Sequence, residues 1–189
     1  MRPDDPDSPW KRISTKSVYE NPWIQVEEHA VLNPAGNPGI YGTVHFKNIA
    51  IGVVPLDSEG MTWLVRQYRF PLKEFSWEVP EGGGDPGISP LDSAKRELTE
   101  ETGISAKVWT LLRRIHLSNS VSDEEGFVYL AQDLEFGPSS PEETEILEVK
   151  KFSIQEAWEM VCRGGITDSL TVIGLTEVRW GAARKFFAD

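Results

Sequence analysis

Three glutamates near the middle of the chain are the residues whose type and spacing best suit a chemical role. Glu97, Glu100 and Glu101 stand at positions i, i+3 and i+4, so on a helix their carboxylates share one face. Like charges at this spacing repel each other, and near the C-terminal end of a helix they also oppose its dipole. A divalent cation such as Mg²⁺ removes both penalties, because it takes oxygen ligands. The alternative is an ordinary solvated, glutamate-rich surface.

The residues around the glutamates predict the helix that must carry them. Ser89 is a good N-cap, Pro90 suits the first helical position, and Gly103 suits the left-handed stop. Apolar residues between these signals recur at helical spacing and would pack inward. We therefore expect a short amphipathic helix that begins after Ser89 and ends before Gly103. The glycines at 82–84 predict a loop that precedes the helix.

The stretch 82–104 resembles the box of the Nudix hydrolases, written G-x5-E-x7-R-E-U-x-E-E-x-G-U, where U is aliphatic. One position departs, because Ile88 stands where the first glutamate belongs. In the family that glutamate often pairs with the box arginine, so Arg96 needs another partner, and Asp85 or Asp92 is the candidate. The matching positions are Gly82, Arg96, Glu97, Leu98, Glu100, Glu101, Gly103 and Ile104.

The resemblance implies a metal site. Glu97 and Glu101 would be the main ligands of Mg²⁺, or of Mn²⁺, and Glu100 would contribute to the metal site and to catalysis. The backbone carbonyl of Glu81 matches a further metal ligand of the family. Together these groups would hold one to three ions, which neutralise a pyrophosphate and activate water for its hydrolysis.

The resemblance also places a catalytic base in the loop before the last strand. That loop carries Glu142, Glu143 and Glu145, and the segments that follow it point to Glu143 or Glu145. The alternative for this acidic stretch is a solvated connection with no chemical role.

The segments LVRQYRFPL and SWEVPEGGG resemble the lead-in to the box in ADP-sugar pyrophosphatases. This resemblance makes Arg69 a substrate or structural contact and gives Glu78 a part in building the site. Arg66 could also bind phosphate, because guanidinium matches phosphate oxygens in a fork; the alternative is an ordinary exposed arginine pair. The implied substrate is ADP-ribose or a related nucleotide sugar. GDP-mannose, another nucleotide substrate or a non-catalytic ligand sensor stays open, because Asn119 replaces a proline usual in the ADP-ribose group.

Composition narrows the partners and the compartment. The formal charge of −11 argues against a nucleic-acid backbone or an anionic membrane as partner. No stretch has the length and apolarity of a membrane span, and no secretory signal opens the chain. The single Cys162 cannot form an internal disulfide, so we expect a cytoplasmic protein. Its position in an apolar helical pattern predicts a small buried residue.

The order of predicted elements indicates an α/β protein, the Nudix α/β/α sandwich with a mixed central sheet. A small antiparallel sheet at 10–47 would precede the catalytic domain at 48–189, after a disordered tail at 1–9, with Val18 and Val31 among its inward residues. The resemblance implies a homodimer that exchanges this sheet; the sequence alone also permits a monomer. Asp168 would cap a long C-terminal helix that reaches Phe186. The expected strands cover residues 10–20, 23–32, 41–46, 49–56, 61–69, 107–117, 127–132 and 146–152.

Overall fold

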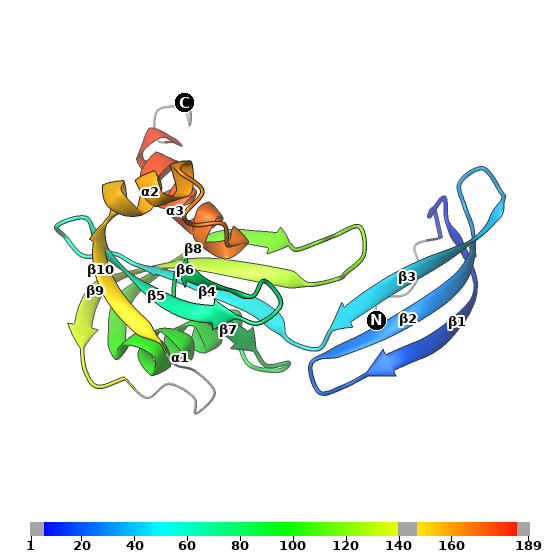
Figure 1. Cartoon of the computed structure of the whole chain (residues 1–189), viewed down its shortest axis with the longest axis horizontal. Helices are drawn as coiled ribbons and strands as arrows, with labels where there is room; N and C mark the ends of the chain where they lie inside the picture. Colours follow the sequence, from blue (N-terminus) through cyan, green and yellow to red (C-terminus); the bar gives the residue numbers. More distant parts are fainter. Residues whose placement is uncertain (1–5, 140–146, 185–189) are drawn as a thin grey trace. The chain divides into compact units, whose positions relative to one another are not determined.

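The computed structural model describes residues 6–139 and 147–184. The chain divides into two compact units, one formed by residues 1–49 with 116–125 and the other by residues 50–115 with 126–189. The elements are β1 (Lys11–Glu20), β2 (Ile24–Leu32), β3 (Pro38–Phe46), β4 (Ile49–Pro55), β5 (Met61–Arg69), β6 (Glu74–Glu78), β7 (Glu81–Gly84), α1 (Pro90–Thr102), β8 (Ile104–His116), β9 (Glu125–Phe136), β10 (Glu148–Ser153), α2 (Ile154–Cys162) and α3 (Ser169–Arg184) (Figure 1).

The first unit contains the antiparallel sheet β1-β2-β3. Asparagine turns shape it as expected: the Asn21 side chain accepts hydrogen bonds from the amides of Trp23 and Ile24, at 2.9 and 2.8 Å. Val31 is buried, but Val18 is 57% exposed, so the prediction that Val18 faces inward is wrong. All residues of β1 are exposed, so neither face of this strand is covered within the single chain.

The segment 116–125, which joins β8 to β9, belongs to the first unit. Its main chain bonds to β3, where the Val44 amide donates to the Val121 carbonyl at 2.8 Å. The Asp123 carboxylate accepts from the Phe46 amide at 3.0 Å and lies 2.5 Å from Nδ1 of His45. A cavity of about 800 Å³ lies among these parts of the first unit. The segment 116–125 is therefore a bonded part of the first unit.

The second unit is built on two sheets, β10-β5-β6 and β7-β4-β9-β8, in which β4 and β9 run parallel. Figure 1 shows α1 on one side of these strands and α2 with α3 on the other, which confirms the predicted α/β/α arrangement with a mixed sheet. Burial of apolar side chains from both sheets and from α2 and α3 stabilises this unit. The buried core residues are Val54, Leu64, Val79, Val128, Ala157, Ile166, Leu170 and Leu175.

Local signals position the helices of the second unit. Ser153 and Glu156 form a reciprocal capping box at the start of α2, as expected from a serine before a helical pattern. Cys162 is the last residue of α2 and is exposed, so the prediction that it is buried is wrong. The glycines at 82–84, expected in a loop, belong to the short strand β7. Phe186 and part of the expected tail at 1–9 lie outside the described residues.

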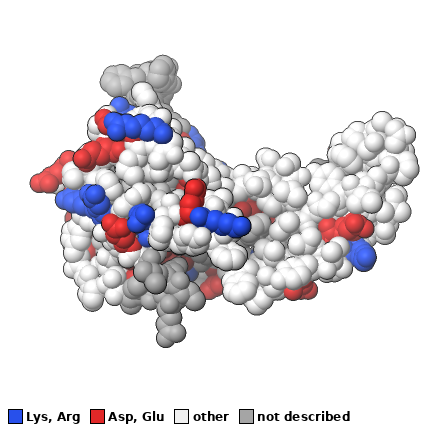
Figure 2. All heavy atoms as spheres, in the orientation of Figure 1, with Lys and Arg blue, Asp and Glu red and all other residues white. Residues whose placement is uncertain are grey.

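Within the described part of the chain, none of the helices combines the length and the apolarity that crossing a membrane requires. Figure 2 shows acidic and basic side chains interspersed over the second unit on the face in view. On that face the acidic side chains do not gather into one patch.

Candidate functional site

The predicted glutamate helix is present as α1. The hydroxyl of its N-cap, Ser89, accepts a hydrogen bond from the Asp92 amide at 3.1 Å. At the other end Gly103 has φ of 70°, and its amide donates to the Thr99 carbonyl at 2.8 Å. A glycine takes this left-handed conformation without steric cost, so the helix ends where the sequence predicts.

Two of the three glutamates are buried against β7. Glu97 and Glu101 are only 7% and 2% exposed, and Oε2 of Glu101 accepts a hydrogen bond from the Glu81 amide at 3.0 Å. A Cβ atom placed on Gly82 would lie 2.3 Å from Cδ of Glu97 and 2.4 Å from each of its carboxylate oxygens. The Glu97 carboxylate therefore occupies space that only a glycine leaves open.

Arg96 supplies the positive charge beside this pair. Its Nη2 atom donates to Oε1 of Glu97 and to the Gly83 carbonyl, both at 2.7 Å, and its Nη1 atom donates to Oε2 of Glu100 at 2.8 Å. Burial lowers the pKa of Arg96, but the charges of Glu97 and Glu100 outweigh it and raise that pKa. A guanidinium with several donors can serve both carboxylates and the carbonyl at once.

These contacts answer the question raised by Ile88, which replaces the first glutamate of the box. Ile88 is 46% exposed, and Arg96 takes its partners from α1 and from β7. Asp92 bonds instead to Ser89, at 2.7 Å, and to Lys95, at 3.1 Å. The bonds of Arg96 go to Glu97, Glu100 and Gly83, so the prediction that Asp85 or Asp92 replaces the missing glutamate as its partner is wrong.

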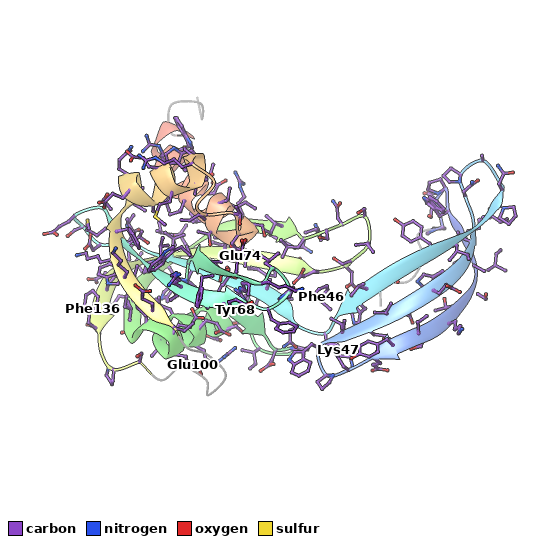
Figure 3. All side chains as sticks on the ribbon, in the orientation of Figure 1. Phe46, Lys47, Tyr68, Glu74, Glu100 and Phe136 are labelled. Carbon is purple, nitrogen blue, oxygen red and sulfur yellow. The ribbon has the colours of Figure 1, made fainter. Side chains whose placement is uncertain are left out.

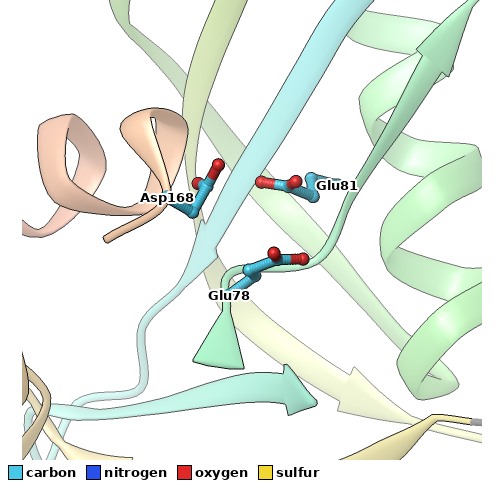
Figure 4. Close-up of side chains that lie close together, drawn as sticks. All are labelled: Glu78, Glu81 and Asp168. Atoms are coloured by element: carbon cyan, nitrogen blue, oxygen red, sulfur yellow. The ribbon is translucent and has the colours of Figure 1, made fainter. Parts of the chain in front are cut away.

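The box glutamates do not converge on one point. Figure 3 shows Glu100 on α1, with its carboxylate bonded to Arg96, while Glu101 bonds to the backbone of β7. Among the described residues, the group of three acidic side chains whose ligand oxygens all lie within 4.8 Å of one another is Glu78, Glu81 and Asp168 (Figure 4).

Arg69 joins two members of that acidic group. Its Nε atom donates to Oε1 and Oε2 of Glu78, at 2.9 and 3.0 Å, and its Nη2 atom donates to Oε2 of Glu78 at 2.6 Å and also pairs with Glu81. Burial lowers the pKa of Arg69, but Glu78, Glu81 and Asp168 outweigh it and raise that pKa. Glu78 is 2% exposed, so the paired carboxylate fixes the orientation of this guanidinium.

Arg66, the second arginine expected to bind phosphate, is held more loosely. Its Nη1 atom lies 3.4 Å from Oε2 of Glu148, and its guanidinium lies 4.3 Å from the ring centroid of Phe75. Arg66 and Arg69 are on the same strand, β5, yet only Arg69 joins the acidic group.

Asp168 was missed as a member of the site, because its sequence signal is that of a helix cap. Its Oδ2 atom does accept a hydrogen bond from the Thr171 amide at 2.7 Å, as an N-cap should. The Thr171 hydroxyl in turn accepts from the Val79 amide at 2.9 Å. This long-range bond brings the start of α3 against the segment between β6 and β7, which no local pattern predicts.

The expected base residues Glu142, Glu143 and Glu145 lie outside the described residues. The other predicted site residues all lie in the described part of the chain: Glu78, Glu81, Glu97, Glu100, Glu101, Arg66 and Arg69.

A family model described as NUDIX domain matches residues 46–165. The chain belongs to the NUDIX family. It is a pyrophosphohydrolase, as the Nudix box on α1 and β7 indicates. A second family model, described as Nucleoside diphosphate sugar hydrolase N-terminal domain, matches residues 10–44.

Individual relatives agree with this assignment. The chain is 32% identical to an ADP-ribose pyrophosphatase of Mycobacterium tuberculosis over 173 residues, which cover 89% of this chain and 83% of the relative. It is 32% identical over 167 residues to an ADP-ribose pyrophosphatase of Bacillus subtilis, covering 87% and 90%. A crystal structure of an ADP compounds hydrolase superposes with a TM-score of 0.83 at 21% identity, covering 93% and 95%, and supports the Nudix fold.

The residues of the Nudix box fit the divalent metal that this family uses. Glu97 and Glu101 offer hard oxygen donors from buried side chains, which suit Mg²⁺ and Mn²⁺. The missing Cβ at Gly82 leaves the Glu97 carboxylate directly on the backbone of β7. Arg96 pairs with Glu97, and the Glu81 amide donates to Glu101.

Proposed function

We propose that this chain hydrolyses the pyrophosphate bond of ADP-ribose, or of a related nucleotide sugar, in a Mg²⁺-dependent reaction. Water adds across the bond, and the products are a nucleoside monophosphate and a sugar phosphate. The observation that carries the proposal is the buried pair Glu97 and Glu101, packed against the glycine backbone of β7. The relatives named ADP-ribose pyrophosphatase, which match along most of the chain, favour this substrate class.

The metal would be held by Glu97 and Glu101, with Glu100 and the Glu81 carbonyl as further ligands. Mn²⁺ can take the place of Mg²⁺ at such oxygen sites. When bound, the ion neutralises the pyrophosphate and lowers the pKa of water. Arg96 then keeps Glu97 and Glu100 in place, through bonds of 2.7 and 2.8 Å.

Arg69 and Arg66 are proposed to bind the anionic substrate. The Arg69 side chain is 35% exposed even though it pairs with Glu78 and Glu81, so its exposed edge is accessible to a phosphate oxygen of the substrate. Glu78 acts here as a positioning residue, because it fixes the plane of the guanidinium. Arg66, whose side chain is 37% exposed, would add a second, weaker contact.

The proton of the attacking water needs an acceptor. Glu143 and Glu145 are the proposed bases, and Glu100 is the candidate within the described residues. A carboxylate that accepts this proton must stand within hydrogen-bond reach of the water. Single glutamine variants at the three positions would separate them. The true base should show a large fall in kcat with little change in KM or in the Mg²⁺ requirement, whereas loss of a metal ligand at Glu100 should also raise the Mg²⁺ concentration that gives half-maximal activity.

Two alternatives remain in the same test. GDP-mannose or a nucleoside triphosphate could be the substrate, and a protein of this fold could also act as a ligand sensor without turnover. The presence of Glu97, Glu100 and Glu101 favours an enzyme. A panel of nucleotide sugars and nucleoside triphosphates, assayed with and without Mg²⁺ and with product analysis, distinguishes these outcomes.

The test is sharpened by a variant of the box. We expect Glu101→Gln to lower turnover by orders of magnitude and to leave the fold intact, because the amide keeps the shape of the side chain while removing its charge. Glu59→Gln, in an exposed turn, is the matched control for loss of one acid. Near-normal turnover of Glu101→Gln would overturn the metal assignment, and turnover of none of the panel by the wild-type protein would favour the sensor.

A cytoplasmic homodimer, in which residues 10–47 exchange between copies and residues 48–189 carry catalysis, completes the proposal. Trp23, Ile40 and Ile13 of the N-terminal sheet are 66%, 73% and 64% exposed in the single chain, and exposed apolar side chains of this size favour association. The exposed Cys162 thiol is compatible with a reducing compartment. Light scattering at micromolar concentration tests the dimer, and a monomeric mass would count against it.

A further inference from the structure

Glu78, Glu81 and Asp168 come together from three separate elements of the second unit. Glu78 ends β6, Glu81 begins β7, and Asp168 precedes α3. Figure 4 shows their carboxylates turned toward a common space, and one ligand oxygen from each lies within 4.8 Å of the others. Three acids do not make a site by themselves, since acidic groups gather on many protein surfaces.

The second observation is the state of the Glu81 side chain. It is 9% exposed, and its Oε2 atom is buried without a hydrogen-bond partner among the described residues. Burial of a charged oxygen that has no partner is costly. Since Glu81 belongs to the acidic group, the cost of burying this oxygen points to a positive species bound at this place.

The charges of the three carboxylates and of Arg69 are matched by a divalent ion. Three carboxylates carry three negative charges when ionised, and Arg69 returns one positive charge through its bonds to Glu78 and Glu81. Other polar partners add no charge: the side-chain amide of Gln67 donates to Glu78 at 3.2 Å, and the backbone amide of Thr171 donates to Asp168 at 2.7 Å. A net charge of about −2 is left, which one divalent ion balances.

We infer that Glu78, Glu81 and Asp168 form a second binding site for a hard divalent cation, separate from the Nudix box. Hard cations lie about 2.0–2.6 Å from each oxygen ligand, so two ligands of one ion are at most about 5 Å apart. The spacing of 4.8 Å or less agrees with this limit. The bound ion would join β6, β7 and the start of α3, and therefore has a structural role beside the proposed reaction.

A proton shared between Glu81 and Asp168 is the competing occupant. Burial first, then the charges of Asp168 and Glu78, and also a side-chain hydrogen bond with Asp168 raise the pKa of Glu81, while Arg69 lowers it. A proton would remove one negative charge and supply one donor. It would leave the group with a net charge of about −1 and would give no binding of metal ions.

Binding of Mn²⁺ separates the two occupants. In a Glu97→Gln/Glu101→Gln background the Nudix box is weakened, and we expect one Mn²⁺ per chain to remain, measured by electron paramagnetic resonance of free Mn²⁺. Adding Asp168→Asn should weaken this remaining site at least about tenfold, since asparagine caps a helix as well as aspartate does but carries no charge. Glu81→Gln should weaken the binding of this Mn²⁺ by a similar factor. Glu59→Gln, in an exposed turn, should leave Mn²⁺ binding unchanged.

Each outcome decides the question. Failure of the background variant to bind Mn²⁺ at millimolar concentration would assign the group to a proton and overturn the inference. A remaining ion that survives both Asp168→Asn and Glu81→Gln would place it elsewhere and would also overturn it. If the double variant does not fold, the wild-type protein and Asp168→Asn are compared directly, and loss of one bound Mn²⁺ per chain is required. Because none of these measurements uses turnover, they are independent of the proposed substrate.

Discussion

Substitution of Gly82 by alanine tests whether the position of the Glu97 carboxylate controls the reaction. The new Cβ atom would lie 2.3 Å from Cδ of Glu97, while ordinary van der Waals contact begins at 3.4 Å. The carboxylate must therefore retreat by about 1 Å, and a displacement of this size in a catalytic group costs about 10²-fold in rate. We expect turnover at low Mg²⁺ to fall by about that factor, with a rise in the Mg²⁺ concentration that gives half-maximal activity.

The fold should tolerate the same change. The atoms that the Cβ meets are the far end of a flexible side chain, so the free energy of unfolding should fall by only about 1–2 kcal/mol. Urea unfolding measures this cost, and Mg²⁺ titration of ADP-ribose hydrolysis measures the activity. Gly181→Ala is the matched control, because its Cβ meets no described atom within 4 Å and alanine favours a helix over glycine by about 0.5–1 kcal/mol.

Two results would refute this reasoning. If Gly82→Ala kept wild-type turnover and Mg²⁺ dependence, the Glu97 carboxylate would not need to lie on the backbone of β7. If it lost several kcal/mol of stability, the clash would be relieved by the backbone and the fall in activity would say nothing about the metal. Gly181→Ala should keep wild-type turnover, which excludes a general effect of replacing glycine.

Three further predictions address the core, a cap and a substrate contact. Gly174→Ala should lower the free energy of unfolding by about 1–3 kcal/mol in urea titrations, because its Cβ would lie 2.7 Å from a methyl group of the buried Val54. Hydrogen bonds from Ser153 lower the pKa of Glu156; Glu156→Ala should therefore destabilise the protein above the ordinary glutamate pKa of about 4.3, and the difference should shrink as the pH falls below that value, as measured by urea unfolding. Arg66→Ala should raise the KM for ADP-ribose several-fold with little change in kcat, and an unchanged KM would make Arg66 an ordinary surface residue.

Local signals explain why the box helix could be predicted from the sequence. Ser89, Pro90 and Gly103 act on the backbone within one turn of themselves, so their effects do not depend on the rest of the fold. The placement of Glu97 and Glu101 on one face likewise follows from the period of the helix, whereas their burial was not predicted. The family resemblance added the metal, because spacing alone left a solvated helix face as an equal alternative.

Predictions that depended on strand register or on distant contacts were less secure. Val18 is exposed because the whole of β1 is exposed, on both of its faces, and alternation alone does not tell whether either face of a strand is covered. Cys162 fits an apolar pattern but ends its helix, where solvent reaches it. The glycines of β7 read as a loop because glycine is depleted in strands, and pairing with β4 overrides that preference.

Position 81 shows most clearly what a pattern of residues leaves out. The resemblance gives a role to its backbone carbonyl, yet the structure uses two other groups of the same residue. The Glu81 amide donates to Glu101 on α1, while the side chain pairs with Arg69 and faces Asp168 before α3. A residue that contacts both groups of acids couples them, since displacement of the Glu81 backbone would disturb the box and the second acidic group together. Glu81→Ala would keep the backbone amide and carbonyl and would remove only the side chain that pairs with Arg69 and faces Asp168. This variant therefore disturbs the second acidic group while leaving the backbone contact with the box in place.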